Sequence, residues 1–180
     1  RRERSYWLSD ARAKAPRLPV DTAGSADIQQ SARNVNVALD AEETQTLLHE
    51  VPKAYQTQIN DVLLTALLLA FRGWSDESSL LVDLEGHGRE ALFDDVDLTR
   101  TVGWFTTLFP VLLEIEGTGP GDALKAVKEQ LRGVPRRGIG YGLLRYLGGD
   151  PAESARFAAL PQAELVFNYL GQLDQALSED

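Results

Sequence analysis

The chain has 180 residues, of which 43% are hydrophobic and 25% are charged, values that are ordinary for a globular domain with its own core. The formal net charge of −9 argues against nucleic acid as a partner, because binding phosphates needs a basic surface. The sequence has no cysteine and only two histidines, which excludes disulfides, thiolate metal sites and histidine-rich metal sites. The most apolar run, residues 62–71, is shorter than the roughly 20 residues that span a bilayer. No signal peptide opens the sequence, so we expect no membrane partner and a cytoplasmic location.

The beginning of the chain is predicted to be a short helix followed by a linker. Tyr6, Trp7 and Leu8 form the apolar cluster of this region, and we expect the helix to dock on the rest of the chain through them. Residues 16–32 are rich in proline, glycine and small polar residues, which is typical of a linker.

A strand and two helices are predicted next. Apolar side chains alternate with polar ones over residues 34–39, which indicates a strand. Asp40 is a good helix N-cap and Glu43 completes a capping box, so a helix is predicted from there to about position 50, ending near Pro52. A second helix, predicted over residues 60–72, is apolar nearly all round and therefore belongs in the core.

The second half of the sequence mixes strands and helices. Strands are predicted to begin at residues 80–82, to run from residue 100 to about residue 116, and to cover residues 165–170. Helices are predicted over residues 122–132 and 141–147, with an irregular segment at 151–161. The order β-α-α-β-β-α-α-β predicts an α/β fold, a two-layer sandwich with helices packed on a mixed sheet.

The stretch EGHGRE, residues 85–90, carries the most distinctive chemistry. In an extended backbone Glu85 and His87 point to the same face, because side chains two positions apart share a side. Gly86 and Gly88 point the other way and carry no side chain, so another group can approach the backbone closely there. A carboxylate and an imidazole beside bare backbone indicate a site that moves a proton.

EGHGRE followed by RTVGWFTTLFP, residues 100–110, resembles the C-terminal half of an epimerization domain of a non-ribosomal peptide synthetase. Three further stretches fit that family in the same order: INDVLLTAL, PRRGIGYG and FNYLGQ. The resemblance implies two lobes, each like a chloramphenicol acetyltransferase, that face one another across a tunnel. Residues 34–180 then form the C-terminal lobe, and residues 1–33 are the helix and linker that come from the preceding lobe.

The resemblance also implies a reaction. An epimerase removes the Cα proton of an aminoacyl or peptidyl thioester and returns a proton to the opposite face, which requires a base, an acid and stabilisation of the enolate oxygen. By resemblance, Glu85 is one acid–base group, and the other is the second histidine of an HHxxxDG motif on the N-terminal lobe. Tyr169 matches a family tyrosine that could donate to the enolate oxygen. No cofactor is implied beyond the phosphopantetheine of a peptidyl carrier protein, which carries the substrate.

The residues alone leave other roles open. We expect Glu85 to be buried among apolar strand neighbours, where an acid–base carboxylate is tuned, but a structural ion pair with Arg89 or Arg100 would also suit it. His87 could line the tunnel or, as we favour, fix the glycine turn through hydrogen bonds. Tyr169 could equally be a core residue on a final strand.

The side chains expected to support the site in this interpretation are His87, Arg89, Arg100 and Asn168. Asn168 faces away from Tyr169 in a strand and is expected to fasten a turn. Arg100 is expected to hold its loop to a carboxylate such as Glu90 or Asp97. The two aromatic residues of the GWF stretch are expected to be core residues, namely Trp104 and Phe105.

Two rival functions remain. A condensation domain, which forms peptide bonds, belongs to the same superfamily, although EGHGRE and FNYLGQ resemble the epimerizing branch more closely. A catalytically inactive module kept for docking on a carrier protein or on the other lobe is the second rival. The HHxxxDG motif does not occur in this sequence, so we expect no epimerization by this chain without the N-terminal lobe.

Overall fold

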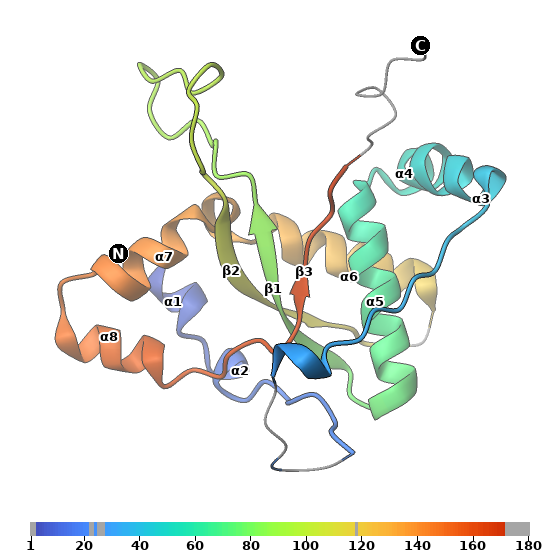
Figure 1. Cartoon of the computed structure of the whole chain (residues 1–180), viewed down its shortest axis with the longest axis horizontal. Coiled ribbons are helices and arrows are strands. Elements are labelled where there is room, and N and C mark those ends of the chain that lie inside the picture. Colours follow the sequence, from blue (N-terminus) through green and yellow to red (C-terminus); the bar gives the residue numbers. More distant parts are fainter. Residues whose placement is uncertain (1–2, 22–23, 25–27, 118, 172–180) are drawn as a thin grey trace.

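The computed structural model describes residues 3–21, 24, 28–117 and 119–171, and at its centre lies a three-stranded mixed sheet (Figure 1). Strands β1 (Ser79–Gly86) and β2 (Thr107–Glu114) pair antiparallel. Strand β3 (Val166–Phe167) pairs parallel with β1, so the strand order is β2-β1-β3. Strand β1 is therefore central and carries Glu85 near its carboxyl end.

In the view of Figure 1 the helices flank the strands, with α5 and α6 to the right and α7 and α8 to the left. The α-helices among the described residues are α1 (Arg4–Trp7), α2 (Asp10–Ala13), α3 (Ala41–Gln45), α4 (Val51–Tyr55), α5 (Ile59–Ser75), α6 (Pro120–Arg132), α7 (Ile139–Leu147) and α8 (Pro151–Ala158). Short 3-10 helices occupy Gln29–Ser31 and Pro135–Gly138, and a π-helical turn occupies Thr46–Glu50. Within the described part of the chain, the helices are all too short or too polar to cross a membrane.

The core forms on one face of the β1–β2 ladder. In an antiparallel pair, residues directly opposite one another point to the same side. The register places three apolar pairs on that side, namely Leu80 with Leu113, Val82 with Val111, and Leu84 with Phe109. All six are buried, and they pack with apolar side chains of α5 and α6, including Leu68 and Val127.

The N-terminal helix α1 contributes to the same core. Trp7 is fully buried, and its ring packs against Phe109 of β2 and Tyr141 of α7. Arg12 of α2 is also buried, and its guanidinium donates to the backbone carbonyl of Pro110. Helix α1 thus docks on the body of the molecule through the predicted apolar cluster.

The predicted fold class, an α/β arrangement with helices packed on a mixed sheet, is confirmed by this architecture. Several local predictions also hold. Asp40 and Glu43 form a reciprocal capping box at the start of α3. The long apolar helix, α5, supplies three fully or nearly fully buried side chains to the core: Leu64, Leu68 and Phe71.

The predicted strand over residues 34–39 was wrong. These residues lie outside any strand, and Val35 and Val37 are 88% and 89% exposed. Alternation of apolar residues predicts an extended backbone, but a strand exists only where another strand accepts its hydrogen bonds. In the described part of the chain, the sheet does not reach this segment.

Element boundaries also differ from the predictions. The helical region after Asp40 continues past Pro52 to Tyr55, because the π-helical turn lets a new helix, α4, begin with proline in its first turn. Residues 151–158 form helix α8 rather than an irregular segment, since Asp150 caps it and Pro151 opens it. Strand β2 begins only at Thr107, so residues 100–106 belong to a loop.

Candidate functional site

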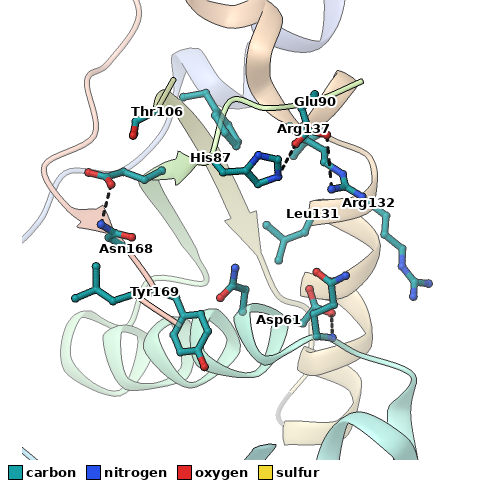
Figure 2. Close-up of a pocket in the computed structure, with 16 residues that line it drawn as sticks. Asp61, His87, Glu90, Thr106, Leu131, Arg132, Arg137, Asn168 and Tyr169 are labelled. Carbon is teal, nitrogen blue, oxygen red and sulfur yellow. Dashed lines mark hydrogen bonds and ion pairs between the residues drawn. The ribbon is translucent and has the colours of Figure 1, made fainter. Parts of the chain in front are cut away.

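A cleft of about 820 Å³ opens at the carboxyl ends of the parallel strands β1 and β3. Its other walls come from the first turn of α5, the last turn of α6 and the segment after α6 (Figure 2). The cleft brings together Glu85, His87, Asn168 and Tyr169, four of the residues singled out from the sequence. Arg89, another of them, does not line it.

Glu85 lies one residue before the end of β1, and its side chain is exposed. The expectation of a buried carboxylate was therefore wrong for this chain, because the sheet ends here and the cleft opens to solvent. Neither Arg89 nor Arg100 forms an ion pair with Glu85 in the described part of the chain. Its partner is instead Asn168, whose side-chain Nδ2 donates to Glu85 Oε2 at 2.7 Å.

His87 is held by its own turn at the rim of the cleft. Its Nδ1 accepts a hydrogen bond from the backbone N–H of Arg89 at 2.9 Å. Its Nε2 lies 3.2 Å from Glu90 Oε1, and the other Glu90 oxygen lies 3.6 Å from Arg137 Nη1. Because Nδ1 accepts this hydrogen bond, a ring proton lies on Nε2, the nitrogen that faces Glu90. These contacts are those of the hydrogen-bonded role favoured for His87.

Arg89 secures the loop of residues 87–106. Its guanidinium donates to the carbonyl of Leu98 at 2.7 Å and lies 4.2 Å from the ring centroid of Phe105. Phe105 is half-buried in this contact, whereas Trp104 is 93% exposed. The expectation that Trp104 is a core residue was wrong, because its segment lies in the projecting loop and not in strand β2.

Arg100 is exposed on the same loop and pairs with neither of its expected partners. Glu90 is engaged by His87 and Arg137. The Asp97 carboxylate accepts a hydrogen bond from the backbone N–H of Thr99, and this bond lowers the pKa of Asp97. The expected ion pair of Arg100 with either carboxylate was therefore wrong.

Tyr169 follows Asn168 and points the other way. Figure 2 shows Asn168 directed toward its carboxylate partner, while the Tyr169 ring lies over helix α5. The polar first turn of α5 forms this wall, where Asp61 is buried and accepts from the backbone N–H of Gln58 at 2.8 Å. Gln58 and Asp61 were not singled out from the sequence. The start of the INDVLLTAL motif was the signal that could have found this wall.

The last residue of the FNYLGQ motif, Gln172, lies outside the described residues.

Two residues before Glu85, on the same side of β1, Asp83 is half-buried. Burial raises the pKa of Asp83, and the nearby Arg145 and Arg12 oppose that rise. In the part of the chain that the structure describes, no three acidic or histidine side chains gather in a way that could hold a metal ion.

A model of the condensation domain family matches residues 1–180. The chain belongs to the condensation domain family. A linear gramicidin synthase from Brevibacillus parabrevis is 53% identical over 178 residues, a match that covers 98% of this chain and 2% of that protein. A chondramide synthase from Chondromyces crocatus is 50% identical over 174 residues, covering 97% of this chain and 4% of that protein. The chain thus spans a small fraction of these curated relatives.

Solved structures agree with the condensation-family fold. The epimerization domain from the third module of tyrocidine synthetase B is 39% identical with a TM-score of 0.76, covering 83% of this chain and 34% of that chain. The first condensation domain of the calcium-dependent antibiotic synthetase, in complex with a substrate analogue, is 20% identical with a TM-score of 0.60. That match covers 82% of this chain and 32% of the other and shows the fold alone.

Proposed function

We propose that the chain is the C-terminal lobe of an epimerization domain in a non-ribosomal peptide synthetase. One observation carries the proposal. Glu85 of EGHGRE and Tyr169 of FNYLGQ, far apart in the sequence, line one cleft in a chain that is 39% identical with a solved epimerization domain. The substrate would be an aminoacyl or peptidyl thioester on the phosphopantetheine of a peptidyl carrier protein.

The proposed reaction inverts the Cα centre of that substrate. One base takes the Cα proton, the thioester carbonyl holds the resulting negative charge as an enolate, and an acid on the opposite face returns a proton. Glu85 is one of these two groups, and the second histidine of HHxxxDG, on an N-terminal lobe that faces the cleft, is the other. The Tyr169 hydroxyl would donate a hydrogen bond to the enolate oxygen, where charge develops.

Peptide-bond formation is the second candidate, because the family model that matches the chain is described as a condensation domain. A condensing domain does not need a carboxylate that exchanges the Cα proton. Exchange of that proton with solvent therefore separates the two functions.

The test is Glu85→Gln in a domain that joins this chain to an HHxxxDG lobe. The amide keeps the shape of the side chain but cannot accept a proton, so Cα deuterium exchange of a carrier-bound substrate should fall by about 10²–10⁴-fold. Thermal stability should change little, because Glu85 is exposed. Glu114→Gln, an exposed carboxylate on β2 outside the cleft, is the matched control and should exchange at the wild-type rate.

Each result has a defined meaning. Exchange within a factor of a few of wild type in Glu85→Gln would end the acid–base assignment of Glu85. Peptide-bond formation without Cα exchange in the wild-type domain would favour condensation. Neither activity in a folded wild-type domain would leave the docking module as the function.

A further inference from the structure

The side chain of Asn168 makes an unexpected contact. We infer that Asn168 is a positioning residue that orients the Glu85 carboxylate for proton transfer, an inference that rests on the proposed function. The sequence predicted that Asn168 fastens a turn. Its amide, just past the end of β3, donates instead to Glu85 on β1, 83 positions away, at 2.7 Å.

The sheet register creates this contact. Parallel pairing sets Asp83 opposite Val166 and Leu84 opposite Phe167. The next position along both chains is therefore Glu85 beside Asn168. A slip of one residue would bring an aromatic side chain, Phe167 or Tyr169, to that place and turn Asn168 to the other face.

An exposed glutamate has several rotatable bonds and needs a partner to hold one orientation. Asn168 binds Oε2 of Glu85 and leaves Oε1 to take up or give back a proton. The bond therefore selects the orientation that proton transfer requires.

A neutral donor suits this task better than a cation. An arginine at the same distance would hold the carboxylate more tightly but would make it a much weaker base. The arginine of EGHGRE, Arg89, donates instead to the carbonyl of Leu98 and packs against the ring of Phe105. Asn168 thus orients Glu85 without neutralising it.

The test compares Asn168→Leu and Asn168→Asp with wild type in a domain carrying the HHxxxDG lobe. Loss of a hydrogen bond to a charged group should lower kcat for Cα exchange by about 10–100-fold, with KM little changed. The acid limb of the pH–rate profile should move to higher pH in the aspartate variant, where a second carboxylate faces Glu85.

The other titratable groups that line the cleft are the same in every variant. A shift of the acid limb of the pH–rate profile therefore reports on the substitution at position 168. These groups are Asp61, His87, Glu90, Arg132, Arg137 and Tyr169. Asn34→Asp, an exposed asparagine outside the cleft, is the control for added charge and should leave rate and profile unchanged. A merely structural role of Asn168 would lower the folded fraction but would move neither the limb nor kcat per folded molecule.

A second readout needs no activity. In the 180-residue chain, the side-chain amide resonance of Asn168 should move as Glu85 titrates, and this movement should vanish in Glu85→Gln. If the amide resonance of Asn168 responds neither to the titration of Glu85 nor to Glu85→Gln, the hydrogen bond between the two side chains is refuted. An unchanged kcat and profile in both Asn168 variants, with Glu85→Gln inactive, overturns the positioning role alone. A wild-type domain without Cα exchange overturns the proposed function and this inference with it.

Discussion

Gly88 lies where strand β1 gives way to the loop of residues 87–106, and its bare backbone lets the end of that loop return close to its base. Its φ of +67° is in the left-handed region that favours glycine. A Cβ at this position would collide with the backbone carbonyl oxygen of Phe105. The sequence predicted that another group approaches the backbone closely at the glycines of EGHGRE. At Gly88, the approaching group is the backbone of Phe105 in the same chain.

Gly88→Ala should displace the loop and destabilise the chain by about 1–3 kcal/mol, because the strain and the collision act together. His87 and Arg89 flank this position, so the loop should become a faster target in limited proteolysis. Gly142→Ala is the control, since a Cβ there meets nothing within 4 Å. Equal thermal unfolding and proteolysis rates for the two variants would contradict the role given to Gly88.

At the scale of secondary structure, the short helix α1 depends on packing for its existence. It has only four residues, and an isolated helix of that length is not stable in water. Trp7 supplies the packing, because its ring is fully buried against Phe109 of β2 and Tyr141 of α7. Helix α1 and the central hairpin therefore share one core.

Trp7→Ala should cost about 3–5 kcal/mol, the usual loss when a large buried aromatic side chain is removed. Thermal or denaturant unfolding of the 180-residue chain measures it. Trp104→Ala removes the same side chain from a position that is 93% exposed and should leave stability nearly unchanged. If both substitutions cost the same, α1 does not dock as described.

At the scale of the whole molecule, the loop of residues 87–106 projects from the end of the sheet away from the helices (Figure 1). It exposes large apolar side chains, with Val102 97%, Trp104 93% and Phe93 65% accessible to solvent. Large apolar surfaces tend to find partners. We expect this loop to contact the lobe that bears HHxxxDG in a complete domain.

The 180-residue chain should therefore self-associate or bind that lobe, and replacing both Val102 and Trp104 by serine should weaken the association. Sedimentation across a range of concentrations measures self-association, and titration with the lobe measures binding. Trp74→Ser, at an exposed position on α5, is the control and should keep the association of wild type. A wild-type chain that stays monomeric and does not bind the lobe that bears HHxxxDG would refute this expectation.

Much of the fold was predictable from local patterns. The capping box of Asp40 and Glu43, the apolar helix α5 and the strand entered at Leu80 all follow from residues near one another in the sequence. Propensity, capping and burial act over a few residues, so such patterns are visible without a structure. The resemblance to epimerization domains implied that Glu85 and Tyr169 belong to one site, and both residues do line one cleft.

Only the tertiary structure decided what depends on contacts between distant segments. The hydrogen bond from Asn168 to Glu85 exists because β3 pairs with β1 in one particular register. Residues 34–39 alternate as a strand should, yet no described strand pairs with them. Trp7 and Trp104 are the same residue type with opposite burial. A sequence states what each residue can do locally, whereas burial and pairing are properties of the neighbours that the fold brings together.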